Sequence, residues 1–270
     1  MRTLLLSFIV FWLYAFAQAQ IAPEFFRCEA QSADTAQLQA NLAALSDNVL
    51  KDLPESEEKR LRTIFRRIFN KYLKHYRQGS TLANVLQSGH YDCLSGTIVF
   101  AHVLRQAGFQ TVVYETNIHV FLTVVLGNGV EVLIETTDPI NGLVTSPTMV
   151  ARRKEEYIRR FAAYREQEAS HYRSEFQIMR AIPFEELAGL QCFNRAVTAY
   201  NNKQFALAAD YLFQSQSLMT TERGMELMIL SLEGILAHHS LTSEKQLALL
   251  DAIEQYKSKL SRLPKLAVYK

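Results

Sequence analysis

The fold class is decided by residues 93–136, which run CLSGTIVFAHVLRQAGFQTVVYETNIHVFLTVVLGNGVEVLIET. The first part, to Ala107, is apolar on most sides, which predicts a buried helix, and Gly108 is of the type that commonly follows a helix end. Three strand-length apolar stretches follow, at 110–116, 118–126 and 130–136. Gly127-Asn128-Gly129 between the last two predicts a hairpin. A helix followed by antiparallel strands indicates an α+β fold.

Helices are predicted on both sides of this segment. An Ala- and Leu-rich stretch covers 34–53, a second helix follows Pro54, and a short turn of helix lies at 81–86. Beyond Pro147 the chain is again helical, in a charged stretch to about Tyr172 and a longer run from Phe184 to the end. We predict four divisions of the chain: a signal peptide at 1–19, an N-terminal helical segment at 20–78, a core at 79–147 and an all-helical region at 148–270.

The first nineteen residues have the pattern of a signal peptide. Arg2 is followed by an apolar run to Phe16 and by Ala17-Gln18-Ala19, a small-x-small pattern that signal peptidase recognises. We therefore expect an exported protein, periplasmic or secreted. Lys plus Arg is 29 against 27 for Asp plus Glu, so no global charge indicates a nucleic-acid partner.

In an oxidising compartment cysteines tend to form disulfides, and this chain has three outside the predicted signal peptide: Cys28, Cys93 and Cys192. Their odd number leaves at least one thiol outside an internal disulfide. We expect Cys28 and Cys192 to be bonded to each other or buried, with Cys93 free.

Cys93 has the surroundings of a nucleophile. It begins a predicted helix, after a glycine-containing loop at 87–92. A helix N-terminus offers positive partial charge and free N–H groups, which stabilise a thiolate. The Cys93 N–H could also bind a developing oxyanion, with Gln87 as a second donor.

A general base and an orienting acid are expected on the neighbouring strands. His119 lies in an apolar stretch, where an unpaired imidazole would be costly. A three-residue hairpin loop sets Phe121 opposite Glu135, diagonal to His119 on one face, whereas a two-residue loop sets His119 opposite Asp138. Glu135 is favoured, because Asp138 precedes Pro139 and is typical of a turn.

This arrangement resembles the transglutaminase-like, papain-like cysteine superfamily over roughly residues 80–145. That superfamily has the order Cys, His, Asp, with the acid often in a D-P-T-like segment, and Ile134-Glu135-Thr136-Thr137 occupies that place with Glu for Asp. Many members carry Trp after the Cys or two residues after the His, where this chain has Leu94 and Phe121. Gln87, six residues before the Cys, makes the site more similar to the peptidase end.

The resemblance implies a cysteine-dependent acyl transferase or hydrolase acting on amide bonds of polypeptides. Its catalytic residues would be Cys93, His119 and Glu135, with Gln87 at the oxyanion. No cofactor or metal is expected, because no second His/Cys cluster at finger spacing accompanies His90 and Cys93.

The C-terminal region carries a second resemblance. One set of residues has the spacing of a tetratricopeptide helical hairpin: Phe193, Ala196, Tyr200, Ala209 and Phe213. A weaker copy follows about 34 residues later. The alternative function is therefore a catalytically inactive core joined to a module that binds a peptide or protein.

The helix after Pro54 is strongly amphipathic. We expect its apolar side to be buried, namely Phe65, Ile68, Phe69 and Tyr72, and part of its basic side to lie at least partly outside, namely Arg60, Arg67, Lys71 and Lys74. Eight basic and no acidic residues lie between Lys59 and Arg77. This face is either simply solvated or a contact with an anionic envelope surface.

Overall fold

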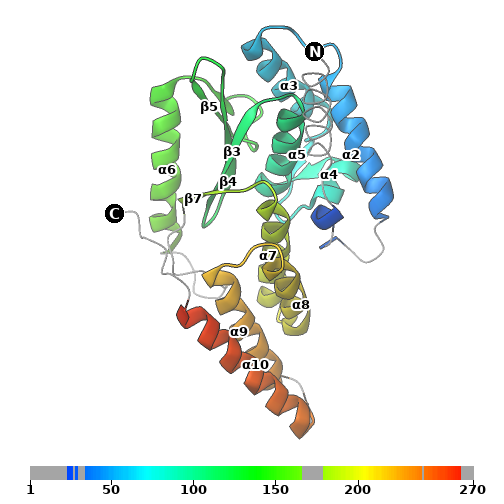
Figure 1. Ribbon diagram of the computed structural model, residues 1–270, viewed down its shortest axis with the longest axis vertical. Coiled ribbons are helices and arrows are strands. Elements are labelled where there is room, and N and C mark those ends of the chain that lie inside the picture. The colour runs from blue at the N-terminus through cyan, green and yellow to red at the C-terminus, as the bar shows by residue number, and fades with distance from the viewer. Residues whose placement is uncertain (1–22, 27, 30–33, 166–178, 239, 263–270) are drawn as a thin grey trace, which may run out of the picture.

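The computed structural model describes residues 23–26, 28–29, 34–165, 179–238 and 240–262. The predicted signal peptide at 1–19 lies outside these residues. The chain has an α+β fold, as predicted: an antiparallel sheet with helices on both faces, and paired helices at one end (Figure 1). Within the described ranges, no helix is both long and apolar enough to cross a bilayer.

The main sheet has the strand order β6-β5-β4-β3-β7, with every neighbouring pair antiparallel. Its strands are β3 (Gln110–Thr116), β4 (Val120–Val125), β5 (Glu131–Ile134), β6 (Leu143–Val144) and β7 (Met179–Ile182). The three strands predicted from the sequence are its centre. β4 begins one residue after His119, so the prediction that His119 lies inside this strand is wrong.

The hairpin between β4 and β5 has the register that favours Glu135. Leu122 pairs with Ile134, and Val125 pairs with Glu131. The loop therefore spans residues 127–129, and Gly129 takes the positive φ of 81° that glycine allows there. Continued by one position, this register brings Phe121 level with Glu135, as the three-residue loop predicts.

Alternation along the strands gives the sheet two buried faces. Leu122 and Ile134 point into the large core around α5 (Cys93–Gln106). Phe121 and Leu133 point to the other face, where they pack with Val150 and Tyr157 of α6 (Pro147–Arg165). Figure 1 shows the sheet between α6 on one side and α5 on the other.

The N-terminal helices pack behind α5. They are the 3₁₀ turn η1 (Pro23–Phe26), α2 (Thr35–Leu50), α3 (Glu57–Lys71) and α4 (Leu82–Ser88). Phe65 and Phe69 of α3 contact Phe100 of α5, with ring centroids 5.7 Å and 5.4 Å apart. Ile68 is also buried, so the prediction is confirmed for Phe65, Ile68 and Phe69, whereas Tyr72, at the helix end, is only half-buried.

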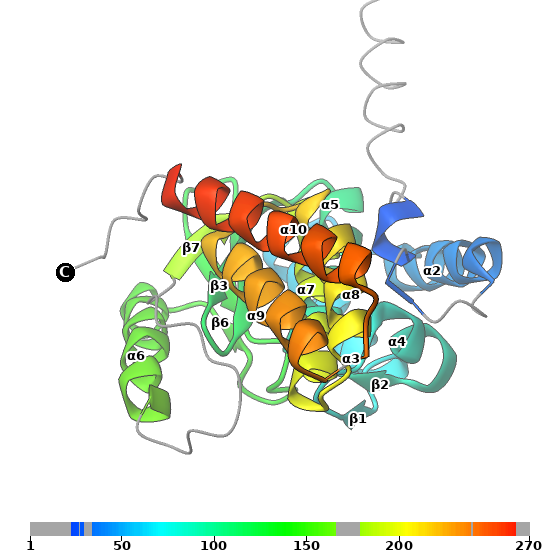
Figure 2. The same cartoon turned by 90° about the horizontal axis from the view of Figure 1, so that it is seen from below.

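The helix after Pro54 is shorter than its apolar spacing indicates. α3 ends at Lys71, and His75–Tyr76 forms a strand, β1, that pairs in parallel with β2 (His90–Tyr91). Tyr76, which fits the helical apolar series, is instead 57% exposed. Figure 2 shows β1 and β2 together at the edge of the molecule.

The C-terminal region forms two helical pairs. The first is α7 (Glu186–Asn201) with α8 (Phe205–Gln216), and the second is α9 (Glu222–His238) with α10 (Ser243–Arg262). These pairs form the tapering lower end of Figure 1. The prediction that 148–270 is all-helical is wrong, because β7 lies within it and pairs with β3 of the core. Four strand residues before Pro183 are too few to show alternation.

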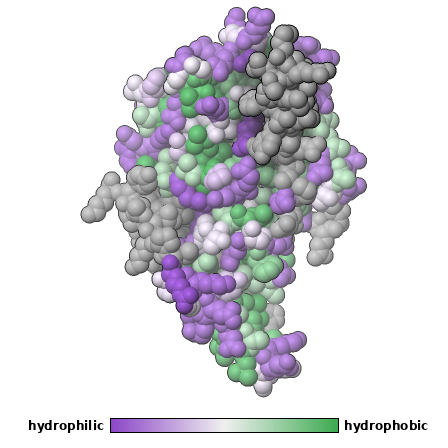
Figure 3. Space-filling model, in the orientation of Figure 1, coloured by the Kyte–Doolittle hydropathy of each residue, from purple (hydrophilic) through white to green (hydrophobic). Residues whose placement is uncertain are grey.

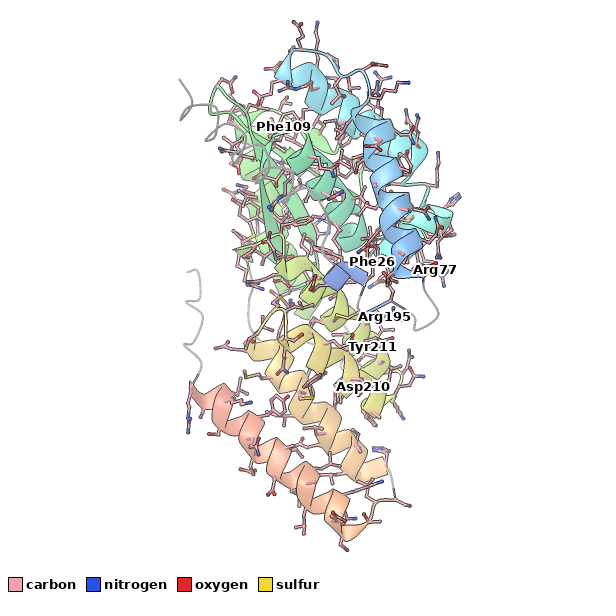
Figure 4. All side chains as sticks on the ribbon, turned by 45° about the vertical axis from the view of Figure 1, so that its right-hand side comes forward. Phe26, Arg77, Phe109, Arg195, Asp210 and Tyr211 are labelled. Carbon is pink, nitrogen blue, oxygen red and sulfur yellow. A yellow bond between two sulfur atoms is a disulfide. The ribbon has the colours of Figure 1, made fainter. Side chains whose placement is uncertain are left out.

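A disulfide joins the N-terminal part of the described chain to α7. Cys28 and Cys192 are bonded, with a Cα–Cα distance of 5.3 Å, and Cys93 is the free thiol, as predicted. Arg195, one turn beyond Cys192, donates to the Cys28 carbonyl and stacks over Tyr211 at 4.8 Å (Figure 4). The extreme N-terminal described residues are therefore tied to α7.

A buried ionic cluster links the sheet to the C-terminal helices. Glu115 of β3 is 1% exposed and bonds Arg180 of β7, with an Nε–Oε2 distance of 3.0 Å. Its second oxygen accepts from Arg223 of α9. Burial lowers the pKa of Arg223 to about 10, so this guanidinium stays charged at neutral pH. Three separate elements thus meet on one carboxylate.

Candidate active site

Cys93 is the first residue of α5, and Asp92 caps this helix. The Asp92 Oδ1 atom accepts from the Ser95 N–H and hydroxyl, both at 2.8 Å. Its Oδ2 atom accepts from the Gly79 N–H at 3.2 Å. The first oxygen caps α5 and the second ties this cap to the loop before α4, so Asp92 fixes Cys93 at the positive end of the helix.

The N-terminus of α5 is anchored to the end of β5. The Thr136 hydroxyl donates to the Cys93 carbonyl at 3.1 Å. Gly96 lies against the same threonine, since a Cβ atom added there would come within 3.3 Å of the Thr136 Cβ. A glycine inside the helix therefore lets its first turn approach the sheet closely.

His119 lies in the tight connection between β3 and β4. Thr116 holds it: the Thr116 Oγ1 atom accepts from the His119 N–H at 3.0 Å, and the Thr116 N–H donates to the His119 carbonyl at 2.8 Å. His119 immediately precedes β4, and Glu135 immediately follows β5. Because these strands are antiparallel neighbours, both residues reach the same end of the sheet, where α5 begins.

Glu135 holds the imidazole. Its Oε2 atom lies 2.7 Å from the His119 Nε2 atom and also accepts from the Tyr157 hydroxyl of α6. Its Oε1 atom accepts from the Thr137 N–H at 3.0 Å and the Thr137 hydroxyl at 2.6 Å. Glu135 is 4% exposed, so this set of donors is what permits a buried carboxylate there.

Asp138, the other acid considered, is a turn residue. Its Oδ1 atom accepts from the N–H groups of Ile140 and Asn141, at 3.1 Å and 2.8 Å. Its Oδ2 atom lies 3.8 Å from Arg153. The structure thus brings His119 to Glu135 and not to Asp138.

The electrostatics of the His119–Glu135 pair favour the charged form of the His119 imidazole. Burial alone would lower the pKa of His119, but the hydrogen bonds and negative charges of Cys93 and Glu135 outweigh it and raise this pKa to about 10. Burial would likewise raise the pKa of Glu135, but hydrogen bonds from His119, Thr137 and Tyr157 lower it to about 2. Because Nε2 bonds Glu135, Nδ1 is the nitrogen left for Cys93.

Gln87 lies exposed in the last turn of α4, and no hydrogen bond joins its amide to Cys93 or His119 in the described chain. Its oxyanion role stays a prediction. Leu94 and Phe121, which stand where many members of the resembled superfamily carry Trp, are both buried. Phe121 stacks between Tyr114 and Tyr157, at centroid distances of 5.3 Å and 4.7 Å.

Two tyrosines of the site were missed from the sequence. Tyr157 contacts both His119, at a centroid distance of 5.0 Å, and Glu135. Tyr76 lies on β1 beside Tyr91, and the charge of Cys93 contributes, after burial, to raising the Tyr76 pKa. In the sequence each of these tyrosines is an aromatic residue in a charged segment, and such a pattern does not indicate which face of its element it lies on or which residue it contacts.

Within the described residues, no cluster of three or more His, Cys, Asp or Glu side chains could hold a metal ion. His90 instead bonds the Ser88 hydroxyl at 2.8 Å through Nδ1. No protein-family model matches this sequence, and no curated protein matches it significantly.

Proposed function

We propose that this chain is an exported cysteine-dependent acyl-transfer enzyme, similar to the transglutaminase-like, papain-like superfamily, that acts on amide bonds of polypeptides. The observation that carries the proposal is His119, held between the Cys93 side chain and the buried carboxylate of Glu135. A nucleophile, a base and an orienting acid in that order are what nucleophilic acyl transfer needs.

The first half of the reaction would form a thioester. In the resting pair the proton of the Cys93 thiol already lies on the His119 Nδ1 atom, and the thiolate sulfur attacks the amide carbonyl carbon. The resulting oxyanion is stabilised by the Cys93 N–H, with Gln87 as the second donor if α4 brings it closer. His119 then protonates the departing amine nitrogen, the C–N bond breaks, and the acyl group stays on sulfur.

The second half would release the acyl group. His119 takes a proton from water or from an amine, whose oxygen or nitrogen attacks the thioester carbon, and the C–S bond breaks. Water gives a carboxylic acid, as in a peptidase or deamidase, and an amine gives a new amide, as in a transglutaminase. Glu135 keeps the imidazole in one orientation throughout and stabilises its charged form.

Two further features support the wider proposal. The Cys28–Cys192 disulfide suits an oxidising compartment, periplasmic or extracellular, rather than a reducing one. The two C-terminal helical pairs suit a tetratricopeptide-like region.

Alkylation of Cys93 tests the proposal. Iodoacetamide should modify wild-type Cys93 faster than free cysteine near pH 6, because the thiolate pairs with an imidazolium. His119→Ala should remove this advantage. A wild-type rate no faster than that of free cysteine would overturn the proposal. Hydrolysis and amine-incorporation assays on casein, run side by side, then identify the acceptor.

The binding-module alternative is favoured by one observation. Large apolar side chains are exposed on α8 and α10, namely Leu207, Phe213, Leu247 and Leu250. Apolar residues are visible at the tapering end of the molecule in Figure 3. Slow Cys93 alkylation without a pH optimum, together with loss of polypeptide binding when Phe213 and Leu247 are changed to Ser, would support this alternative.

A further inference from the structure

Residues 74–77, here called the rim segment, include β1, which pairs in parallel with β2 just before Cys93. It runs alongside the chain that leads into the nucleophile: the N–H groups of Lys74 and His75 donate to the Gly89 carbonyl, at 2.9 Å and 3.1 Å. The Arg77 N–H donates to the Tyr91 carbonyl at 2.8 Å. All four rim side chains are exposed.

The side chains of the rim segment are placed by close contacts with this chain. The Lys74 stem crosses Gly89, where an added Cβ atom would meet the Lys74 Cγ atom at 2.7 Å. Tyr76 meets Tyr91 edge to face, with ring centroids 5.8 Å apart. Since Tyr91 is two residues before Cys93, Tyr76 stands close to the thiol, which agrees with the effect of Cys93 on its pKa.

The Lys74 ammonium donates to the Asn70 carbonyl in the last turn of α3, a contact with a neutral group that leaves its charge unneutralised. In the part of the chain that the structure describes, no carboxylate lies within ion-pair distance of Lys74 or Arg77. The carboxylates nearest along the chain and in the site are otherwise engaged: Asp92 caps α5, and Glu135 pairs with His119. Figure 4 shows Arg77 at the outer edge of the molecule.

We infer that the acyl donor of the Cys93 site is an acidic stretch of polypeptide that lies along the rim segment. This inference rests on the proposed function and deepens it by naming a substrate class. Lys74 and Arg77 would pair with carboxylates on either side of the scissile residue, and the exposed ring of Tyr76 would contact the apolar part of the peptide between them.

Two alkylating reagents that differ in charge test the rim directly. Iodoacetate is an anion and iodoacetamide is neutral, and both react at Cys93, the free thiol. The iodoacetate-to-iodoacetamide rate ratio cancels changes in thiol reactivity. We expect Lys74→Gln with Arg77→Gln to lower this ratio about threefold or more at low salt, since steering by local charge changes encounter rates roughly tenfold to a thousandfold.

The matched control is Lys59→Gln with Arg62→Gln. Both residues are exposed on the first turns of α3, roughly 14–18 Å along the helix from its end at Lys71. They remove the same charge from the same protein, so an equal fall in the ratio would show a general charge effect and would overturn the inference.

A second arm uses a peptide. A ten-residue oligoglutamate should protect Cys93 from iodoacetamide at low salt, an oligoglutamine of equal length should not, and the double rim variant should lose the protection. Absence of protection in the wild type overturns the inference. If the wild type then sediments with anionic vesicles, Lys74 and Arg77 are assigned to a contact with an anionic envelope surface instead. A slow iodoacetamide reaction in the wild type is a separate outcome that counts against the proposed function itself.

Discussion

Two acidic residues three positions apart, Glu135 and Asp138, have opposite surroundings. Glu135 is buried against His119, Thr137 and Tyr157, whereas Asp138 caps an exposed turn. The difference comes from the hairpin register, because a shift of one residue would turn each strand side chain to the other face. The pairing of His119 with Glu135 was therefore predictable from a loop length. The contribution of Tyr157 was not, because α6 has no pattern that specifies which side chain faces the sheet.

Glu135→Gln should keep the fold and lower acyl-transfer turnover by on the order of 10⁴-fold, the cost of removing the orienting carboxylate of a triad. Asp138→Asn, in the same loop, should change turnover by less than about twofold, because its N–H partners can still bond the amide oxygen. Turnover of both variants, with circular dichroism to check folding, makes the comparison. Reversed effects would transfer the orienting role to Asp138.

Tyr157→Phe should move the acid limb of the activity profile to higher pH. The Tyr157 hydroxyl bonds the ionised form of Glu135 and helps to hold its pKa at about 2, below the ordinary 4.5. Without this bond the Glu135 pKa rises, so the carboxylate is protonated sooner as the pH falls. Turnover measured from pH 3 to 8 shows the shift.

Tyr114→Phe is the control for this change, since Tyr114 stacks on Phe121 of the same face but does not bond Glu135. An unchanged acid limb in Tyr157→Phe would mean that its hydroxyl has no part in setting the charge of Glu135.

At the scale of elements, the longer pieces were predictable and the short ones were not. α5 and β3 have enough residues to show a period, and their predicted bounds agree with the structure within one residue. β1, β2 and β6 have two residues each, which is less than any alternation needs, and β7 has four residues, as β5 has, but lacks the hairpin signal that precedes β5. Their positions depend on tertiary contacts, such as the bonds of β7 to β3 and of Arg180 to Glu115.

Arg223→Met should destabilise the protein by about 3–5 kcal/mol, because it leaves Glu115 buried with one cation fewer. Adding Glu115→Gln should recover part of this loss, since the uncompensated charge is then removed. Urea unfolding of both variants measures the difference.

Arg159→Met gives the matched comparison. Its pair with Glu155 is exposed, at 72% and 69%, and is expected to contribute less than about 1 kcal/mol. An Arg223→Met effect no larger than that of Arg159→Met would contradict a structural role for the buried cluster.

At the scale of the molecule, the N-terminal helices, the sheet and the C-terminal helices share one core. The large cluster of buried residues runs from Phe25 to Ile253. The predicted divisions at 78 and 147 therefore separate kinds of secondary structure along the chain rather than independent cores. Sequence patterns report local periods, and they do not report which distant segments share a core.

Cys28→Ser with Cys192→Ser should lower the free energy of unfolding by about 2–5 kcal/mol, because the bond closes a loop with a separation of 164 residues. The expected signature is a lower denaturant midpoint with Cys93 alkylation in native buffer unchanged. Equal midpoints for the wild type and the double variant would show that the bond adds nothing to native stability.

The order of the three cysteines along the chain has a consequence for biogenesis. A polypeptide delivered to an oxidising compartment from its N-terminus presents Cys28 and Cys93 before Cys192 arrives. The first bridge open to it joins a structural cysteine to the nucleophile, and reaching the native bond then requires thiol–disulfide exchange, the chemistry of a disulfide isomerase. A chain that forms this first bridge has its nucleophile blocked until the exchange occurs, so the proposed enzyme would gain its activity only with the native disulfide.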